Sequence, residues 1–486
     1  MIAVEVKAGR WADSAKMMRA ARDAQAVDGV DRAFAFMGTP ANIEEARNLA
    51  LDAPDLEAAR PSDLVIIVQG EAADAGLLVA GAALEDAAVS EQGLPMPLAP
   101  SLRGVDADLA IVSVPGEYAA LDAHKALGAG MDVLLFSDGV SLDAEETLKN
   151  RASGLGKLVM GPGAGTAIVD GVGLGFANTV ASGPVGVVAA AGTGAQEATV
   201  LLEHFGSGIT QCYGTGGRDL YEQIGARTML DAIARLAADD DTRVILCVSK
   251  PPEPSVAEAV VGALGSTGKP AVACFVGGGA GSTEGVEVVA TLDEAARMAA
   301  AAAGAKAAPL AEPMALEPRP GVVRGLFSGG TLCGEAAAIL AELVGDVRTN
   351  APAGNARPLD TSVAPTGHAC IDLGEEEYTR GRPHPMIDPE ARAEQILAQL
   401  EDPELAVLLF DVVLGHGSHP DPAGVLVAAL APVFSARPEM AVIAHVLGTD
   451  HDPQPLTGQE ETLASAGVTV CASNAIAARL AAAAIA

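Results

Sequence analysis

The stretch that decides the fold is GVVAAAGTGAQEATVLL, residues 186–202, together with its counterpart RGLFSGGTLCGEAAAIL, residues 324–340. Each reads as an apolar strand, then Gly-Thr-x-x-x-Glu, then an Ala-rich helix. Near-continuous apolar runs that end in glycine before a helix are typical of parallel strands buried on both faces. The two stretches therefore predict two βα units of one α/β design.

The similarity between the two halves continues beyond these stretches. Three further pairs of blocks follow in the same order: DDTRVILCVS (240–249) and DPELAVLLFD (402–411), KPAVACFVG (269–277) and EMAVIAHVLG (439–448), and VVATLDEAARMAAA (288–301) and VCASNAIAARLAAA (470–483). Repeated blocks in a fixed order indicate a duplicated domain. We expect two copies of a doubly wound domain, at 181–305 and 320–486, joined by an Ala/Pro-rich linker at 306–319.

Upstream of the repeat, the sequence again alternates strands with helical stretches. DLAIVSVPG, DVLLFSDG and LVMGPG are short apolar runs that end in turn residues, which predicts a separate nucleotide-binding-like βαβ region at 99–180. Residues 1–98 are less regular and are expected to form an N-terminal α/β region. The fold class is therefore α/β throughout.

The charge balance limits the possible partners. The chain has 63 acidic and 30 basic residues, a formal net charge of -33, which argues against binding nucleic acid because a phosphate backbone would be repelled. An anionic ligand must then be met by local cationic side chains and backbone N–H groups. Small anionic substrates remain compatible with the composition.

Cysteine usage and hydropathy point to the compartment. The six cysteines are scattered, without a Cys-x-x-Cys pair, as expected for reduced core thiols in a cytosolic protein. The N-terminus MIAVEVKAGRW has neither a basic region nor a sustained apolar region, so no signal peptide is expected. Because no apolar run is long enough to span a membrane, we expect a cytoplasmic protein with no membrane partner.

Ligands of doubly wound sheets bind at the carboxyl ends of the strands, against helix N-termini. Both repeats place a Gly-Thr loop there, where free N–H groups and the helix dipole favour an anion. A tight turn with an N-cap is the structural alternative. The candidate phosphate- or substrate-binding residues of these loops are Gly192, Thr193, Gly194, Ser328, Gly329, Gly330 and Thr331.

Two corresponding loops carry the arginines. GTGGRDL (214–220) contributes Arg218 and Asp219, and YTRGRPHPMIDP (378–389) contributes Arg380, Arg382 and His384 in a backbone stiffened by prolines. Arginine can bind a carboxylate or phosphate through two parallel hydrogen bonds. A charge-balanced turn before a helix is the structural alternative for the same sequence.

Two further polar residues end corresponding strands. They are Lys250 and Asp411, for which strand-end solvation or a helix cap is equally compatible.

Metal binding and nucleophilic hydrolysis have little support. His416 and His419 lie in the Gly/Pro-rich loop GHGSHPDP, which cannot present both imidazoles on one helical face as a zinc protease motif does. No serine sits in a Gly-x-Ser-x-Gly elbow. No metal site is therefore expected.

With the repeat in view, the chain resembles the FdrA family of the NDP-forming acyl-CoA synthetase superfamily. The resemblance runs over nearly the whole length, on motifs that include LLFSDGV, LVMGPGAGTAI, GTGGRDL, VSKPP, GLFSGGTL, GTDHDPQ and, as the most diagnostic, GRPHPMIDP. It implies a Rossmann-like CoA-binding-type domain followed by two flavodoxin-like, succinyl-CoA ligase-like domains. One departure matters: the superfamily relays phosphate through a histidine after a strand of the first flavodoxin-like domain, yet no histidine occurs between His204 and His368.

The resemblance implies a subunit of a multi-component oxamate carbamoyltransferase in allantoin and purine catabolism. Such an enzyme interconverts oxalurate plus phosphate with oxamate plus carbamoyl phosphate and requires no cofactor. We expect the Gly-Thr loops to bind phosphate or carboxylate, the three arginines to clamp the anions, and His384 to donate to the carbamoyl oxygen or shuttle a proton. Other subunits, and a homo-oligomer, are expected as partners.

Two other functions stay open on the sequence. One is CoA-thioester ligation by a route without phosphohistidine, and the other is a non-catalytic scaffold subunit that binds a metabolite. Because copy one has only Arg218 where copy two has two arginines and a histidine, copy two is the better candidate for the active site.

Overall fold

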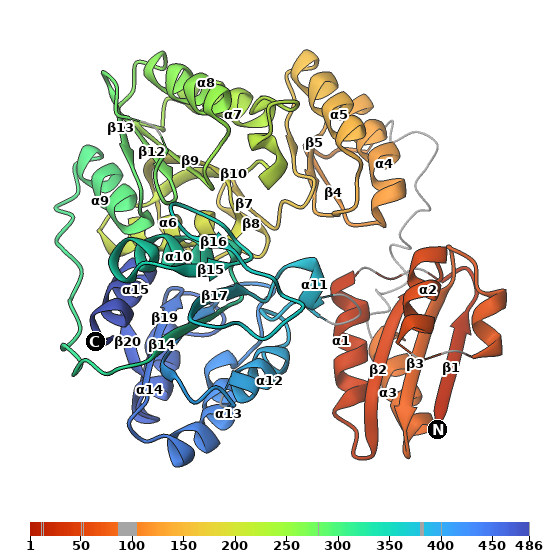
Figure 1. Ribbon diagram of the computed structural model, residues 1–486. Helices are drawn as coiled ribbons and strands as arrows, with labels where there is room; N and C mark the ends of the chain where they lie inside the picture. The colour runs from red at the N-terminus through yellow and green to blue at the C-terminus, as the bar shows by residue number, and fades with distance from the viewer. Residues whose placement is uncertain are drawn as a thin grey trace. The chain divides into compact units, whose positions relative to one another are not determined.

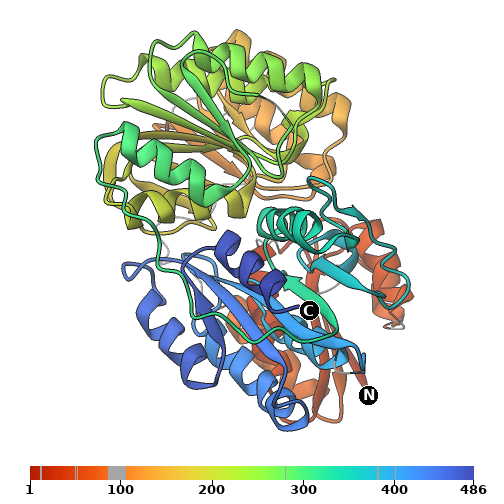
Figure 2. The same ribbon diagram turned by 60° about the vertical axis from the view of Figure 1, so that its left-hand side comes forward.

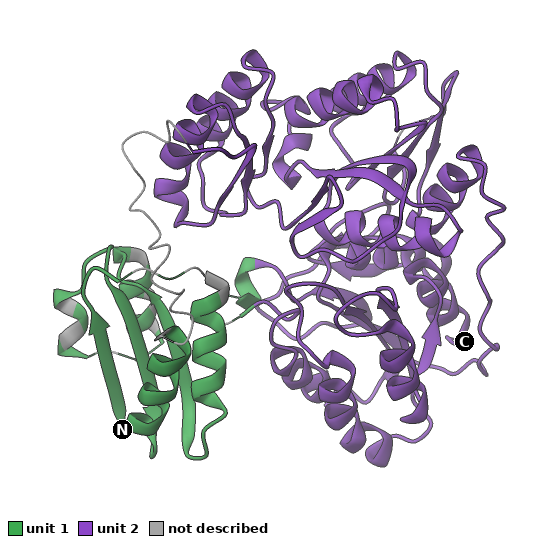
Figure 3. Cartoon of the chain, turned by 180° about the vertical axis from the view of Figure 1, so that it is seen from behind, with its two compact units in different colours: residues 1–103, 376–383 green, residues 104–375, 384–486 purple. Residues whose placement is uncertain are grey.

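The computed structural model of the chain describes residues 1–10, 12, 14–49, 51, 53–85, 105–279, 281–379, 383–399 and 401–485. They belong to two compact units, one made of residues 1–103 with 376–383 and the other of residues 104–375 with 384–486 (Figure 3). Both units are α/β, so the predicted fold class is confirmed. Over the described ranges, no helix is both long and apolar enough to cross a bilayer.

The first unit is an antiparallel sheet with strands in the order β1-β3-β2 (Figure 1). Its elements are β1 (Ile2–Lys7), α1 (Ser14–Gln25), β2 (Val30–Met37), α2 (Pro40–Asn48), β3 (Leu64–Gly70) and α3 (Ala73–Glu85). Successive side chains of a strand point to opposite faces. Ile66 accordingly packs with helices α1 and α3, whereas Ile67 packs with Leu51 and Leu56, so both faces of the central strand are buried.

The second unit begins with a small parallel sheet, ordered β4-β5-β6. It consists of β4 (Leu109–Val112), α4 (Gly116–Gly128), β5 (Asp132–Leu135), α5 (Leu142–Gly154) and β6 (Val159–Met160). Leu134 and Met160 share a core cluster with Tyr213 of the next sheet. The order of strands and helices predicted from its three apolar runs is therefore present in this segment.

Copy one of the repeat forms a sheet ordered β13-β12-β11-β9-β10-β7-β8. Its elements are β7 (Thr166–Val169), β8 (Val172–Gly175), β9 (Ser182–Ala190), α6 (Gly192–His204), β10 (Ile209–Gly214), η2 (Gly217–Leu220), α7 (Arg227–Ala238), β11 (Val244–Ser249), α8 (Pro254–Gly265), β12 (Ala271–Phe275), β13 (Val286–Val289) and α9 (Leu292–Ala302). The β7–β8 hairpin pairs antiparallel with β10. A hairpin that precedes the boundary predicted at residue 180 therefore completes the sheet of copy one.

Copy two forms a parallel sheet ordered β16-β15-β17-β14-β18-β19-β20. Its elements are β14 (Val322–Phe327), α10 (Gly330–Val344), β15 (Val347–Thr349), β16 (Arg357–Pro358), β17 (His368–Asp372), α12 (Glu390–Gln399), β18 (Leu405–Val413), α13 (Pro422–Ala436), β19 (Ala441–Leu447), α14 (Leu456–Ser465), β20 (Thr469–Cys471) and α15 (Asn474–Ala483). The short helix α11 (Glu376–Thr379), which lies between β17 and α12 in the sequence, belongs to the first unit. Strand β17 lies beside β14 as β10 lies beside β9. The predicted correspondence of the loops that follow β10 and β17 is therefore confirmed.

Helices from both copies pack against one another between the two sheets (Figures 1 and 2). Helices α6 and α9 of copy one share a single hydrophobic core with α10 and α15 of copy two. The contact surfaces consist largely of alanine, which lets helix axes approach closely. The repeat motif thus places the starts of α6 and α10 next to each other.

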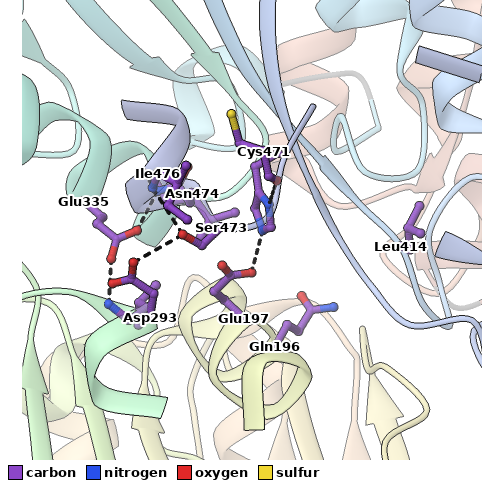
Figure 4. Close-up of polar contacts among 12 residues, drawn as sticks. Gln196, Glu197, Asp293, Glu335, Leu414, Cys471, Ser473, Asn474 and Ile476 are labelled. Atoms are coloured by element: carbon purple, nitrogen blue, oxygen red, sulfur yellow. Dashed lines mark hydrogen bonds and ion pairs between the residues drawn. The ribbon is translucent and has the colours of Figure 1, made fainter. Parts of the chain in front are cut away.

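Two buried carboxylates cross this contact, one from each copy (Figure 4). Nε2 of His445 donates to Oε2 of Glu197 at 2.8 Å, and its Nδ1 donates to the carbonyl oxygen of Cys471 at 3.0 Å. Because both acceptors can only accept, both ring nitrogens carry protons. Burial alone would lower the pKa of His445, but the Glu197 carboxylate outweighs it and raises the pKa to about 9.

Glu335 is the equivalent of Glu197 in copy two. Its carboxyl accepts from the backbone N–H of Leu292 and from Nδ2 of Asn474, each at 2.7 Å. Burial, reinforced by Asp293, raises the pKa of Glu335 to about 8. The glutamate of the Gly-Thr-x-x-x-Glu motif therefore ties each copy to the other, through His445 in one case and through Leu292 and Asn474 in the other.

Candidate functional site

The two Gly-Thr loops face each other. A Cβ atom added to Gly194 would lie 2.9 Å from Cγ2 of Thr331, and one added to Gly329 would lie 2.7 Å from Oγ1 of Thr193. Such close approach requires glycine at both positions, since a real Cβ would displace the facing threonine. The sequence predicted an anion site at either loop, and the structure brings the two loops together.

A cation and a carboxyl group lie against the first residue of α10. A Cβ added to Gly330 would lie 3.4 Å from Nζ of Lys250 and would clash with Oδ2 of Asp372. Lys250 follows β11 of copy one and Asp372 ends β17 of copy two. Among the described residues, Lys250 makes no hydrogen bond and no ion pair within 4.0 Å. An uncommitted ammonium group therefore stands at a helix N-terminus, where the dipole also favours negative charge.

Asp372 was missed by the sequence reasoning. Its side chain is 3% exposed, and Oδ1 accepts from the backbone N–H of Gly374 at 2.9 Å. Burial raises the pKa of Asp372 to about 7, an effect that Lys250 opposes. The signal in the sequence was the acidic residue that ends the run HACID, at the edge of the sheet where Asp411 was noticed.

His384 and the Asp372 carboxyl group both lie against Gly374. A Cβ added to Gly374 would lie 2.5 Å from Nε2 of His384, 3.0 Å from the carbonyl oxygen of Ser328 and 3.1 Å from Oδ1 of Asp372. Nδ1 of His384 accepts from the backbone N–H of Met386 at 3.2 Å. Burial, followed by the nearby Arg392, lowers the pKa of His384 to about 4. The imidazole is therefore neutral near pH 7 and presents an Nε2–H donor to the site.

Asp411 makes capping contacts to the loop before α10, the alternative that the sequence left open beside ligand binding. Its carboxylate accepts from the backbone N–H of Ser328 at 2.8 Å, from Oγ of Ser328 at 2.9 Å and from the backbone N–H of Gly329 at 2.9 Å. Arg392, which is 1% exposed and was not predicted, pairs with Asp411 at 2.5 Å. The Asp411 carboxylate thus occupies the backbone N–H groups of Ser328 and Gly329 and fixes the shape of the loop. The backbone N–H groups that remain for a ligand therefore begin at Gly330.

Arg218 and Asp219 are committed to contacts with α5 and α7. Nε of Arg218 lies 2.8 Å from Oε2 of Glu145, and its Nη2 donates to the carbonyl oxygen of Val140 at 2.7 Å. Asp219 accepts from Nζ of Lys149 at 2.8 Å and from the backbone N–H of Met229 at 2.9 Å. Both residues therefore make structural contacts in this fold, and their predicted role in anion binding stays a prediction. The partners lie up to 78 residues away in the chain, which no local pattern reveals.

The remaining predicted residues divide into two groups. Gly192, Thr193 and Gly194 form the first turn of α6, opposite the α10 loop. Arg380 and Arg382 lie outside the described residues. The described part of the predicted site is therefore the pair of helix starts with Lys250 and His384.

Comparison with known proteins finds a relative that matches nearly the whole chain. YahF of Escherichia coli K12, an uncharacterized protein, is 37% identical over 499 residues, an alignment that covers 97% of this chain and 96% of YahF. This chain belongs to the same family as YahF. Three domain models match this chain. They are a CoA-ligase at 326–484, a CoA binding domain at 181–277 and an "AllF, heavy metal-associated domain" at 1–94.

These matches confirm the predicted order of a CoA-binding-type domain before a CoA-ligase domain. They also correct the location of the CoA-binding domain, because its match falls on copy one and not on the 99–180 region where it was predicted. Solved structures with weak likeness include an acetyl-coenzyme A synthetase of Ca. Korarchaeum cryptofilum in complex with phosphate and ADP, 16% identical over 79% of this chain and 84% of that one, with a TM-score of 0.35. Another is an ATP citrate lyase of Methanothrix soehngenii, 23% identical over 41% and 36%, with a TM-score of 0.31.

The heavy metal suggested by the name of the N-terminal domain does not fit this chain. Residues 1–94 contain neither cysteine nor histidine, the ligands that soft and borderline metals prefer. The described residues likewise hold no cluster of three potential ligands. We therefore assign no metal to the N-terminal domain of this YahF family member.

Proposed function

We propose that this protein is a subunit of a multi-component carbamoyltransferase of allantoin and purine catabolism, which interconverts oxalurate plus phosphate with oxamate plus carbamoyl phosphate. The resemblance to the FdrA family and the match of the AllF-type domain at 1–94 support this proposal. The carbamoyl acceptor, oxamate, and the partner subunits belong to the proposal.

The observation that carries it is the uncommitted ammonium group of Lys250 at the opposed starts of α6 and α10. A small anion bound there meets two helix dipoles and a lysine, in a chain whose net charge of -33 disfavours anions elsewhere. Phosphate or carbamoyl phosphate has the size and charge for such a site. Catalysis would then consist of positioning and electrostatic stabilisation, without a covalent intermediate.

In the proposed reaction, a phosphate oxygen attacks the ureido carbonyl carbon of oxalurate and the carbon–nitrogen bond to oxamate breaks. The backbone N–H groups of Gly330 and Thr331 and the ammonium of Lys250 hold the phosphate. The Nε2–H of His384 donates to the carbonyl oxygen, on which negative charge develops. A neutral imidazole suits this role because its Nε2–H group donates a hydrogen bond while the proton stays on the ring.

The absence of a phosphate-carrying histidine also supports this reaction class. No histidine lies between His204 and His368. His445 of copy two is hydrogen-bonded through both ring nitrogens, and its side chain is 4% exposed. It therefore cannot act as a nucleophile toward ATP or an acyl phosphate in this conformation.

The test is to assay carbamoyl phosphate formation from oxalurate and phosphate, first with the chain alone and then with its partner subunits. In the reconstituted complex, Arg382→Ala and His384→Ala are each expected to lower turnover by about 10²-fold, as loss of a single transition-state donor does. Unchanged turnover and substrate affinity in both variants would refute the assignment. Lys306→Met, which removes an exposed charge in the linker, serves as the control.

CoA-thioester ligation is the second candidate, and the CoA-ligase and CoA-binding matches favour it. ATP-dependent thioester formation by the purified chain, without any carbamoyl transfer in the reconstituted complex, would establish it.

If His384→Ala and Lys250→Met leave a fully active complex, the chain is instead a scaffold whose partners carry the catalysis.

A further inference from the structure

Asp372 is held rigidly at the end of β17. Its backbone N–H donates to Oδ1 of Asn350 at 2.7 Å, and its carbonyl oxygen accepts from Nδ2 of the same asparagine at 2.8 Å. Oδ1 is occupied by the Gly374 N–H. Oδ2 points at Gly330 and, among the described residues, accepts no hydrogen bond. A carboxyl oxygen of this buried residue is thus aimed at the first turn of α10.

Every element around this carboxyl contributes a polar group. Lys250 approaches from the end of β11, Glu375 follows β17, Asp411 lies on β18, and Nε2 of His384 and Oδ1 of Asp372 both lie near Gly374. Asp411 is already paired with Arg392, and His384 is neutral near pH 7. Among the residues that the structure describes here, Lys250 is therefore the cation that an ionised Asp372 and a bound anion would have to share.

An anion at this helix start and an ionised Asp372 repel each other strongly in a buried setting. The pKa of Asp372 is already about 7 because of burial, so the proton is easily available. A protonated carboxyl group has an O–H donor, which Oδ2 can direct toward an anion oxygen. Protonation thus turns a repulsive contact into an attractive one.

We propose that Asp372 is the proton-carrying group of the anion site, which binds a proton together with the anion and hands it on during the reaction. Under the proposed function, on which this step rests, the Asp372 carboxyl gives its proton to the departing oxamate nitrogen. It regains a proton from the hydroxyl of the attacking hydrogen phosphate. The carbon–oxygen bond forms as the carbon–nitrogen bond breaks, and the proton count is unchanged.

Sulfate is the probe that separates this coupling from titration of the ligand, because sulfate does not change charge between pH 5 and pH 9. We expect sulfate affinity, measured by titration calorimetry, to be level below pH 6 and to fall about tenfold per pH unit above pH 7. Calorimetry in two buffers of different ionisation enthalpy should show uptake of about 0.9 proton per sulfate at pH 8.

The isosteric variant Asp372→Asn keeps an acceptor for Gly374 and resembles the protonated acid. It is expected to bind sulfate at all pH values with the low-pH affinity of the wild type, to take up no proton, and to lose transferase turnover. Glu335→Gln, which alters another buried carboxyl of raised pKa, should retain the wild-type proton uptake. Circular dichroism spectra of both variants verify that they are folded.

Two results would overturn the proposal, and they differ in what else they affect. Sulfate binding whose affinity and proton uptake do not change from pH 5 to pH 9 leaves the anion site intact but removes Asp372 from it. Failure of both wild type and Asp372→Asn to bind sulfate refutes the anion site itself, and with it the proposed function.

Discussion

Replacing Glu197 by glutamine tests how the two copies of the repeat are joined. The side chains of Glu197 and His445 are 1% and 4% exposed, and their charged atoms lie 2.8 Å apart. The pKa of His445 is about 9 in the fold and ordinarily 6.5. In the unfolded chain the imidazole releases its proton near pH 6.5, whereas the folded chain keeps it to about pH 9.

This difference fixes the sign and size of the effect. The stabilisation is fully present below pH 6.5 and is lost as pH rises through 9. Since each pKa unit corresponds to about 1.4 kcal/mol, the wild type should lose about 3 kcal/mol of unfolding free energy over this range. In Glu197→Gln, burial keeps His445 neutral, so this part of the pH dependence disappears.

The measurement is urea unfolding followed by far-UV circular dichroism at pH 6.5 and at pH 9, for the wild type and the variant. Glu335, with a pKa of about 8, and Asp372, with a pKa of about 7, also lower the stability as pH rises toward those values, because the folded chain keeps protons that the unfolded chain has already released. Both are present in each protein, and Glu197 adds only a small part to the raised pKa of Glu335, so the difference between wild type and variant reports mainly the Glu197–His445 contact. Glu284→Gln, an exposed carboxyl, is the control. A difference that is the same at both pH values would refute the reasoning.

Three further outcomes are expected. Lys250→Met should weaken sulfate binding about tenfold or more by calorimetry, because the charge is lost at the helix start, whereas Lys306→Met should not change it. Arg392→Met should cost about 3–5 kcal/mol in urea unfolding by leaving Asp411 buried without its cation. His384→Gln should lower turnover by the same factor from pH 5.5 to pH 8, because the pKa of His384 is about 4; a factor that varies through pH 6.5 would contradict a neutral imidazole.

The repeat was the most productive signal in the sequence. It predicted the strands, the helix starts at Gly192 and Gly330, and the matching loops after β10 and β17. These predictions hold because parallel strands with both faces buried leave ligands only one edge of the sheet. Lys250 was noticed for the same reason, since it follows directly on a buried strand.

Other residues depend on packing that the sequence pattern does not encode. Arg218 looked like an anion clamp, yet the interface with α5 binds it to Glu145. Arg392 and Asp372 were overlooked because a single charge on an amphipathic helix, or at a strand end, is usually solvated. Each gained its role only when the fold removed water from around it.

The sequence by itself determined the α/β class, the duplication and the edge of each sheet where polar groups gather. These follow from local periodicity and from the constraint that parallel strands impose. Only the tertiary structure decided that the two Gly-Thr loops oppose each other, that Asp411 occupies the backbone N–H groups of its own loop, and that Asp372 faces Lys250. Those facts depend on distances between segments far apart in the chain and on burial, which sets the charge of each group.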